Sequence, residues 1–265
     1  MRIAYLDINC GIAGDMFLGA LVDAGCSLDQ LSQELSALGI AEEYSISAER
    51  VRRGALMGTR VHVDVKDSPR RGQGRHYSDI VGMIRGNRLP EAVKEDAVAV
   101  FTLLGEVEAR LHGRTLEEIH FHEVGAVDSI VDVVGVCLGL QMMEVAEVYS
   151  SPVTDGHGTI TCDHGVLPVP APATLELLIG APIVSADIPF ELVTPTGAAL
   201  LRHFCKKYGL RPAMVTEAIG YGAGSREIAE RPNLLRITIG QALAGHAGSE
   251  PGHAHDSAHV HTHEE

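Results

Sequence analysis

Side chains that bind metals or transfer protons are concentrated in one short segment near the middle of the chain. Residues 120–132, HFHEVGAVDSIVD, contain two histidines, one glutamate and two aspartates. Alternate side chains of an extended strand project to the same side, so the imidazoles of His120 and His122 can converge on one metal ion. Glu123 follows directly, and Glu123 or His122 is the nearest base for a proton transfer. We therefore expect a metal or acid-base site here.

The two aspartates of this segment fall at the start of an apolar helical run, residues 129–143. We expect Asp128 to cap the helix and Asp132 to lie one turn further on the same face. A carboxylate among aliphatic neighbours is unfavourable unless it is paired, hydrogen-bonded or bound to a cation. Both aspartates therefore join the two histidines as predicted metal ligands. The structural alternative is that Asp128 is only a cap, that Asp132 reaches an arginine and that the histidines have no ligand.

A glycine-rich turn follows the first expected strand, residues 3–8, and precedes a helix. Backbone amides at a helix N-terminus favour an anion such as a phosphate. The spacing matches neither the dinucleotide-binding motif nor the P-loop. We predict that Gly11, Gly14 and Asp15 bind the phosphate of a small molecule. The alternative is that Asp15 is only a helix cap.

A third polar group lies in a segment rich in glycine and proline. Such residues can join a site, but they are also common in simple turns. The glycine-rich segment 220–224, GYGAG, is expected to be a loop that either wraps a ligand or makes a tight turn. The members of the third group are Asp155, His157, Cys162, Asp163 and His164.

The end of the chain holds six of its 14 histidines within 20 residues. Residues 242–265 contain no lysine or arginine and almost nothing apolar, so we expect a disordered tail. Histidine spacings of two and four allow several imidazoles to reach one ion, and nickel and copper rank high in the affinity order of divalent metals. A purification tag is the alternative, although a tag usually repeats one residue. The predicted metal ligands of the tail are His253, His255, His259, His261 and His263.

The remaining patterns predict the elements that position these residues. Pro90 opens the longest amphipathic helix, whose apolar stripe extends to Leu111, and Ser27 caps a shorter one. Strands and helices interleave rather than segregate along the sequence. We therefore predict an α/β fold over residues 1–241, a mixed β-sheet with helices on its faces, with a mobile loop at about 66–76 and a disordered His-rich C-terminal tail.

Composition restricts the function further. The formal net charge of −14 argues against a nucleic-acid partner, which would require basic stripes. Five widely spaced cysteines form no disulfide framework, which indicates a reducing cytoplasm. We find neither a signal peptide nor an apolar run of about 18 residues, so we expect a cytoplasmic protein with no membrane partner.

Several long motifs, in order, resemble one known family. They are YLDINCGIAGDM, FHEVGAVDSIVDVVG, GHGTITCDHGVLPVPAPATLELL, ELVTPTGAALL and GYGAGSRE followed by RPNLLR. Together they are similar to the nickel-insertion proteins of nickel-pincer cofactor biosynthesis. The resemblance implies a nickel-inserting chelatase of the lyase class. Such an enzyme installs Ni2+ in pyridinium-3,5-bisthiocarboxylic acid mononucleotide through two nickel–sulfur bonds and one nickel–carbon bond, with hydrolysis of CTP in the presence of Mg2+ or Mn2+.

The resemblance also implies partners. Members of the family continue past the GYGAG segment into a C-terminal domain associated with the nucleotide, so we expect this chain to be the N-terminal part and to act with a separate C-terminal partner domain. A nickel-pincer-dependent enzyme such as lactate racemase is expected downstream, and we expect a homo-oligomer. The alternatives from other classes are a non-catalytic nickel storage or delivery chaperone and a metal-dependent phosphohydrolase.

Overall fold

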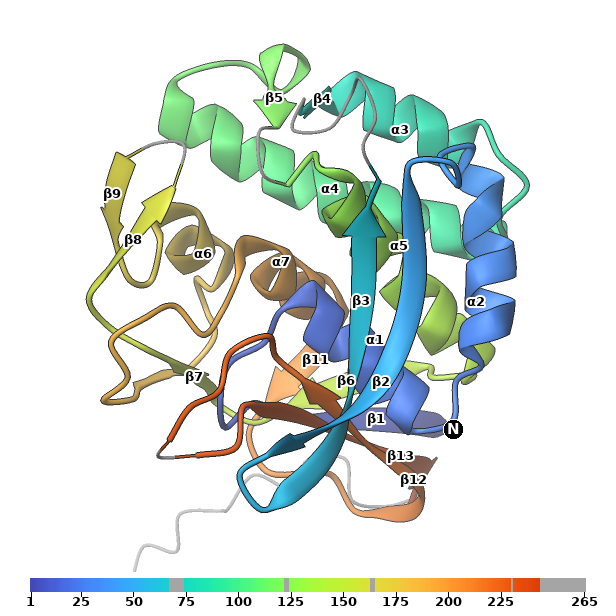
Figure 1. Ribbon diagram of the computed structural model, residues 1–265, viewed down its shortest axis with the longest axis vertical. Helices are drawn as coiled ribbons and strands as arrows, with labels where there is room; N and C mark the ends of the chain where they lie inside the picture. Colours follow the sequence, from blue (N-terminus) through green and yellow to red (C-terminus); the bar gives the residue numbers. More distant parts are fainter. Residues whose placement is uncertain (67–73, 122–123, 163–164, 230, 244–265) are drawn as a thin grey trace, which may run out of the picture.

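A seven-stranded mixed sheet forms one layer of the protein (Figure 1). The computed structural model describes residues 1–66, 74–121, 124–162, 165–229 and 231–243. The strand order is β11-β6-β1-β13-β12-β3-β2. This sheet confirms the predicted α/β class, whereas the predicted disordered tail and most of the predicted mobile loop lie outside the described residues. The strands are β1 (Arg2–Asp7), β2 (Tyr44–Arg53), β3 (Leu56–Val65), β6 (Glu147–Ser150), β11 (Cys205–Tyr208), β12 (Met214–Ala223) and β13 (Leu234–Ala242).

The sheet contains both parallel and antiparallel strand pairs. β1 runs parallel to β6 and antiparallel to β13, and β12 is antiparallel to β13 but parallel to β3. Three small two-stranded ribbons accompany it in the described parts of the chain. They pair β4 (Arg75–His76) with β5 (His120–Phe121), β7 (Val153–Asp155) with β10 (Ile183–Ser185), and β8 (Thr159–Cys162) with β9 (Gly165–Pro168).

The helices are stacked on one another above the sheet. α1 packs directly on β12, β3 and β13, while α5 and α7 pack on α1 and α4 packs on both of them (Figure 1). None of the described helices is long and apolar enough to cross a membrane. The helices are α1 (Gly14–Asp23), α2 (Leu28–Leu35), α3 (Tyr77–Arg85), α4 (Glu91–His112), α5 (Val127–Met142), α6 (Pro172–Leu177) and α7 (Pro195–Phe204), with short 3-10 turns η1 (Ser36–Leu38) and η2 (Leu116–Glu118).

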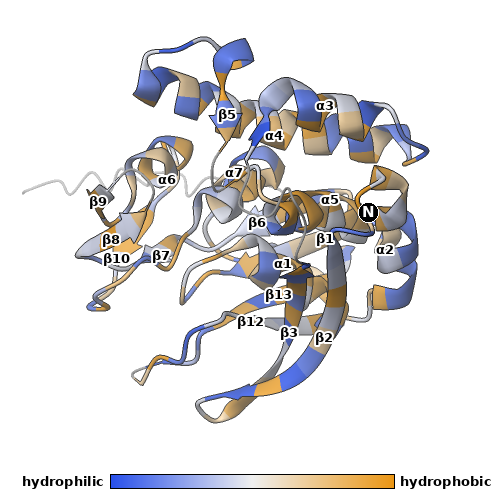
Figure 2. Cartoon of the chain, turned by 45° about the horizontal axis from the view of Figure 1, so that its top comes forward, coloured by the Kyte–Doolittle hydropathy of each residue, from blue (hydrophilic) through white to orange (hydrophobic). Residues whose placement is uncertain are grey.

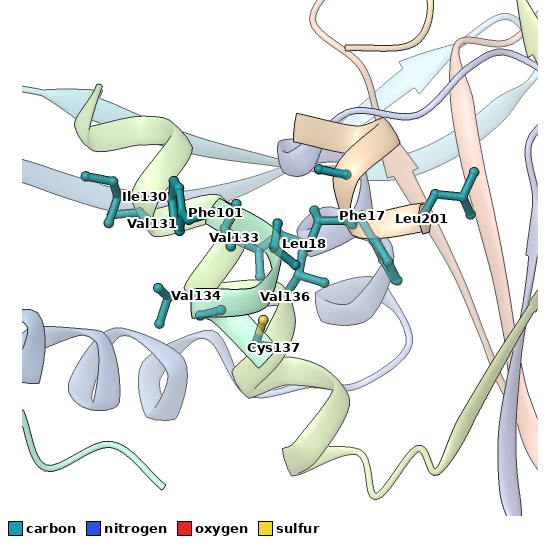
Figure 3. Close-up of a cluster of buried hydrophobic side chains, with 14 of the residues drawn as sticks. Phe17, Leu18, Phe101, Ile130, Val131, Val133, Val134, Val136, Cys137 and Leu201 are labelled. Atoms are coloured by element: carbon teal, nitrogen blue, oxygen red, sulfur yellow. The ribbon is translucent and has the colours of Figure 1, made fainter. Parts of the chain in front are cut away.

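The core is centred on α5, as its sequence predicts. Apart from Asp132, every residue from Ile130 to Leu140 is buried. These side chains meet Phe17 of α1 and Phe101 of α4 (Figure 3), and the hydropathy colouring shows α5 as largely apolar (Figure 2). Burial of each large apolar side chain contributes roughly 1.5–3 kcal/mol, so this contact anchors α1 firmly.

Two glycines of β12 allow α1 to lie against the strand backbone. A Cβ added to Gly222 would lie 1.7 Å from the carbonyl oxygen of Met16, and one added to Gly220 would lie 2.0 Å from that of Ala20. No side chain fits between helix and strand at these positions. The prediction that residues 220–224 form a ligand-wrapping or tight-turn loop is therefore wrong, because most of the segment is strand, and Gly220 and Gly222 serve helix packing.

Local sequence signals correctly predicted where α2 and α4 begin. The Ser27 hydroxyl accepts a hydrogen bond from the Gln30 amide at 3.3 Å, which confirms Ser27 as the cap of α2. α4 begins directly after Pro90, as predicted. Leu111 was expected on the core stripe of this helix but is 41% exposed, because it lies in the last turn, beyond the packing neighbours of α4.

Candidate functional site

Two helices begin side by side and bring three aspartates together. Asp15 lies in the first turn of α1, and Asp128 lies in the first turn of α5. Asp132, one turn further along α5, packs its side chain on Gly14, where an added Cβ would lie 2.8 Å from Asp132 Oδ2. The positive ends of both helix dipoles favour negative charge at this point. The three residues are called the acidic cluster below.

Neither Asp15 nor Asp128 is the cap of its helix. The N-cap residues are Ala13 and Ala126, and neither helix has a side-chain cap. The Met16 amide donates to Asp15 Oδ1 at 2.7 Å, and the amide following Asp128 donates to its Oδ1 at 2.8 Å. The prediction that Asp128 caps α5 is therefore wrong: both carboxylates bind amides inside the first turn.

The acidic cluster is electrostatically strained. Burial raises the pKa of Asp15, and the charge of Asp128 adds to the effect, while Arg60 and His62 of β3 oppose it. The pKa of Asp132 is raised well above its usual range by burial first and then by the charges of Asp15 and Asp128. Within the described residues, Asp132 Oδ1 is fully covered and has no hydrogen-bond partner. A proton or a cation between the carboxylates would relieve this repulsion.

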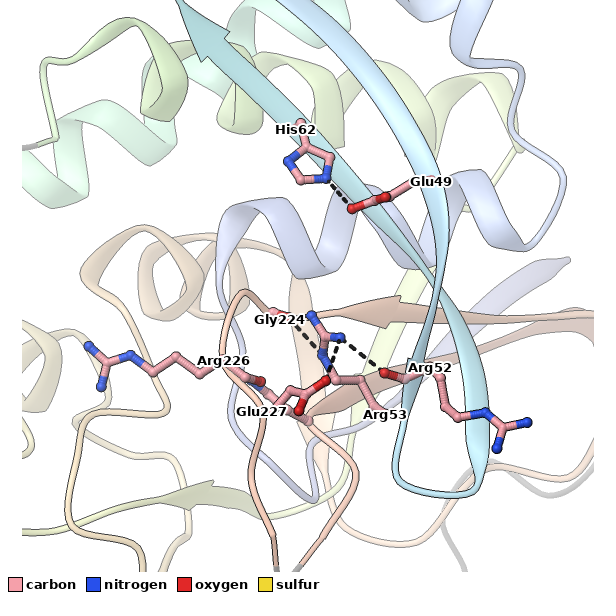
Figure 4. Close-up of polar contacts among 8 residues, drawn as sticks. Glu49, Arg52, Arg53, His62, Gly224, Arg226 and Glu227 are labelled. Atoms are coloured by element: carbon pink, nitrogen blue, oxygen red, sulfur yellow. Dashed lines mark hydrogen bonds and ion pairs between the residues drawn. The ribbon is translucent and has the colours of Figure 1, made fainter.

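Arg60 and His62 are residues of the site that the sequence analysis missed. They project from the same side of β3, two residues apart, and His62 Nε2 lies 2.8 Å from Glu49 Oε1 of the neighbouring strand (Figure 4). Apolar and polar residues alternate in this strand, which is typical of any half-buried strand. Only the presence of two basic side chains on one face could have indicated that a group of carboxylates lies opposite.

A second site lies about His120. A cleft of about 390 Å³ opens between the end of α4, β5 and the β8–β9 hairpin, and it is lined by His112, His120 and Cys162 among others. We call it the histidine cleft. His120 pairs across the β4–β5 ribbon with His76, and the two imidazole rings lie edge to face with their centroids 4.7 Å apart. Rings this close can bind the same ion.

The structure describes neither of the two predicted partners nearest to His120 in the sequence but gives His120 an unexpected one. His122 and Glu123 lie outside the described residues, so their roles as ligand and base stay predictions. His76 was assigned to a loop in the sequence analysis, yet it forms β4 and faces His120. Its pairing depends on strand contacts between distant segments, which no local pattern reveals.

A third feature is a cleft of about 310 Å³ at the start of α1. Its lining includes Asp15, Thr194, Ser225 and Arg226, and we call it the arginine cleft. Thr194 caps α7 by accepting a hydrogen bond from the Gly197 amide at 3.2 Å. Three residues, Ile160, Cys162 and Glu191, line both the arginine cleft and the histidine cleft. The two clefts are therefore neighbouring compartments on either side of these shared residues.

The predicted phosphate-binding turn is tightly packed within the protein. Gly11 has a φ of +77° and lies so close to Leu192 that an added Cβ would be 2.0 Å from the Leu192 carbonyl oxygen. The Ile12 amide donates to the same oxygen at 3.1 Å. Phosphate binding by Gly11, Gly14 and Asp15 stays a prediction; of the three, Asp15 lines the arginine cleft.

Asp155 of the third polar group acts as a structural anchor. Its buried Oδ1 accepts hydrogen bonds from the amides of Gly156 at 2.7 Å, Leu192 at 2.9 Å and Val193 at 3.2 Å. Burial raises the pKa of Asp155, while these amides lower it. The carboxyl group thus ties the end of β7 to the segment that packs on Gly11.

The other predicted ligands are dispersed or undescribed. His157 is exposed and pairs with Asp187 at 3.1 Å. Asp163, His164 and the tail histidines lie outside the described residues. Across the described ranges, no three His, Cys, Asp or Glu side chains gather closely enough to hold a metal ion. The predicted single site of His120, His122, Asp128 and Asp132 therefore stays a prediction.

Together these features define a class: an α/β protein in which one histidine of an imidazole pair and one aspartate of an acidic cluster line two adjoining clefts. Within that class, the chain belongs to the nickel insertion protein family, whose model matches residues 4–263. This match confirms the family inferred from the sequence motifs. No solved structure matches the chain.

Relatives with similar sequences have consistent names. The chain is 45% identical over 250 residues to the pyridinium-3,5-bisthiocarboxylic acid mononucleotide nickel insertion protein of Desulfitobacterium hafniense (strain DSM 10664 / DCB-2), covering 94% of this chain and 61% of the relative. A protein of the same name from Geobacillus kaustophilus is 45% identical over 248 residues, 91% of this chain and 60% of the relative. A putative nickel insertion protein of Roseiflexus castenholzii is 47% identical over 241 residues, 90% of this chain and 59% of the relative. The chain spans about three fifths of the length of these relatives.

Proposed function

We propose that this protein binds Ni2+ and inserts it into pyridinium-3,5-bisthiocarboxylic acid mononucleotide, which yields the nickel-pincer cofactor of lactate racemase-type enzymes. Membership of the nickel insertion family and the names of the relatives support the proposal. The single structural observation that carries it is the imidazole pair of His76 and His120, because His120 also lines the wall of a ligand-sized cleft.

In this proposal the imidazole pair holds nickel before transfer. Neutral imidazole is a good ligand for nickel, and His122 and Glu123 follow His120 directly in the sequence. Cys162 also lines the histidine cleft and is a soft sulfur donor. The histidines of residues 253–263 collect the ion, since a tethered multidentate segment raises its local concentration.

The insertion step requires one proton transfer. Nickel binds the two thiocarboxylate sulfurs, and a nickel–carbon bond replaces a carbon–hydrogen bond of the pyridinium ring. The ring proton leaves to a base while nickel keeps its +2 charge. We assign the base to Glu123 or His122, which are adjacent to the imidazole pair in the sequence.

Other components of the proposal rest either on the chemistry of the residues, for the two aspartates, or on the family resemblance, for the nucleotide and the partner domain. We propose that Asp128 and Asp132 act as metal ligands, that CTP is consumed with Mg2+ or Mn2+, and that a separate C-terminal partner domain handles the nucleotide. The product is passed to a racemase-type enzyme. We place the reaction in the cytoplasm, and the five unpaired cysteines support a reducing compartment.

The nickel site is tested by substitution in the full chain with its tail histidines changed to serine. His76→Ala and His120→Ala should each weaken nickel binding at least about tenfold in isothermal titration, because each removes one of two coordinated ligands. His157→Ala is the control, since His157 lies on the surface in a pair with Asp187. Unchanged affinity in both variants, or an equal loss in the control, would refute the nickel site.

A separate assay distinguishes insertion from nickel storage. The nickel-loaded protein is mixed with the precursor, and the product is followed by mass spectrometry, with and without the C-terminal partner and CTP. Insertion gives a nickel-containing product with one hydrogen fewer on the ring. A storage protein binds nickel but yields no such product under either condition.

A further inference from the structure

We propose that the arginine cleft binds the phosphate group of the mononucleotide, with Arg226 as the anion-binding side chain. The proposal deepens the function proposed above and rests on it for the identity of the ligand. It moves the predicted phosphate contact from Gly11, Gly14 and Asp15 to Arg226, which lines the same cleft as Asp15.

Arg226 is held in position by an aromatic ring. Its guanidinium carbon lies 4.9 Å from the centre of the Phe190 ring. Stacking of this kind fixes the plane of the guanidinium while its N–H groups at the edge stay available to an anion. Within the described residues, no carboxylate lies within ion-pair distance of the Arg226 guanidinium. An arginine fixed in this way is suited to a phosphate, which it can bind through two parallel hydrogen bonds.

Hydrogen bonds from two buried side chains hold the backbone next to Arg226 in place. The buried Arg53 donates from Nε at 3.2 Å and from Nη2 at 2.7 Å to the carbonyl oxygen of Gly224 (Figure 4). Asn233, also buried, donates from Nδ2 to the carbonyl oxygen of Arg226 at 2.9 Å, and the Gly224 amide donates to the Asn233 carbonyl at 3.1 Å. The segment 224–226 is therefore preorganised, which reduces the entropy lost when a ligand binds.

The charges along the two clefts follow the order of groups in the proposed ligand. Arg226 supplies positive charge at the arginine cleft for the phosphate. Asp15 and Glu191 also line this cleft and complement the positive pyridinium ring. Cys162 and Glu191 continue into the histidine cleft, where the thiocarboxylates would meet nickel at His120. A volume of about 310 Å³ lies within the usual range for a small-molecule site.

The proposal is tested with two pyridinium probes in the full-length protein. The first is nicotinic acid mononucleotide, and the second is the corresponding riboside, which lacks the phosphate. Binding is measured by isothermal titration without nickel, in the wild type and in Arg226→Gln. The wild type should bind the mononucleotide at least tenfold more tightly than the riboside, and the variant should bind both equally weakly. A tenfold loss corresponds to about one hydrogen bond between charged groups.

Matched variants separate the role of Arg226 from a general charge effect. Arg52→Gln removes an exposed arginine whose side chain extends away from Arg226 (Figure 4), so the preference for the mononucleotide should be unchanged. Arg226→Lys keeps the charge but not the planar fork and should recover only part of the affinity. Phe190→Leu should weaken mononucleotide binding less than Arg226→Gln, because the charge remains while its orientation is lost.

Three results would overturn the proposal. It is wrong if the wild type binds neither probe, if it binds both equally, or if Arg226→Gln keeps the preference of the wild type. Failure of the nickel site has a different signature, in which His76→Ala and His120→Ala leave nickel affinity unchanged while Arg226 still governs the binding of the mononucleotide.

Discussion

The contact between α1 and β12 predicts a sharp effect of adding one methyl group. In Gly222→Ala the new Cβ would lie 1.7 Å from the Met16 carbonyl oxygen and 2.6 Å from the Ala20 amide nitrogen. Real Cβ contacts are essentially never shorter than 3.0 Å. Helix and strand would therefore have to separate by more than an ångström.

The magnitude follows from what holds the helix in place. α1 cannot move away freely, because Leu18 and Leu21 already pack tightly on Gly135 and Gly139 of α5. Overpacked sites of this kind typically lose about 1–3 kcal/mol of unfolding free energy. We expect Gly222→Ala to lie at the upper end of that range, with both contacting atoms belonging to the helix backbone.

The matched control is the same substitution at Gly82. This glycine lies in the exposed middle of α3, and an added Cβ would meet nothing within 4 Å. Gly82→Ala should raise the unfolding free energy by about 1 kcal/mol, because alanine favours a helix more than glycine does. Equilibrium unfolding in urea measures both variants. The explanation fails if Gly222→Ala is as stable as the wild type, or if both variants lose stability equally.

The remaining predictions concern the buried carboxyl group of Asp155. Asp155→Ala leaves three backbone amides without an acceptor, and at about 1–3 kcal/mol for each it should lower the unfolding free energy by at least about 3 kcal/mol in the same urea assay. A loss below 1 kcal/mol would contradict the anchoring role. Asp155→Asn keeps an acceptor but does not titrate. Since burial raises the pKa of Asp155 in the folded state, the wild type should lose stability relative to this variant as the pH rises from the ordinary value of 3.8 through the raised one. A difference that is constant with pH would show that folding does not shift this pKa.

Much of the fold could be predicted because its signals are local. α4 follows a proline and has a clear apolar stripe, and α5 is apolar on all sides apart from Asp132, so both helices were expected where they occur. The glycines of segment 220–224 misled the interpretation for a physical reason. Glycine suits a turn and also suits close approach of a helix, and only the position of α1 distinguishes the two roles.

The candidate site could be predicted only in part. Asp132 was expected to need a partner, and the structure places it against Asp15 and the start of α1, which lie more than a hundred residues earlier in the chain. The pairing of His76 with His120 and the stacking of Arg226 on Phe190 likewise join distant segments. Each residue type was visible in the sequence, whereas the neighbours that give it a function arise from tertiary packing.

The close seating of α1 on β12 also determines which mutations the protein can tolerate. Asp15 lies in the first turn of the helix that rests on Gly222, and Arg226 follows four residues after that glycine on the same stretch of chain. Direct backbone contact, without intervening side chains, therefore fixes the spacing between the two walls of the arginine cleft, one carrying Asp15 and the other Arg226. A side chain added at Gly220 or Gly222 would change the spacing between these walls, whereas substitutions in the core that leave α1 seated on β12 and α5 change stability without changing that spacing.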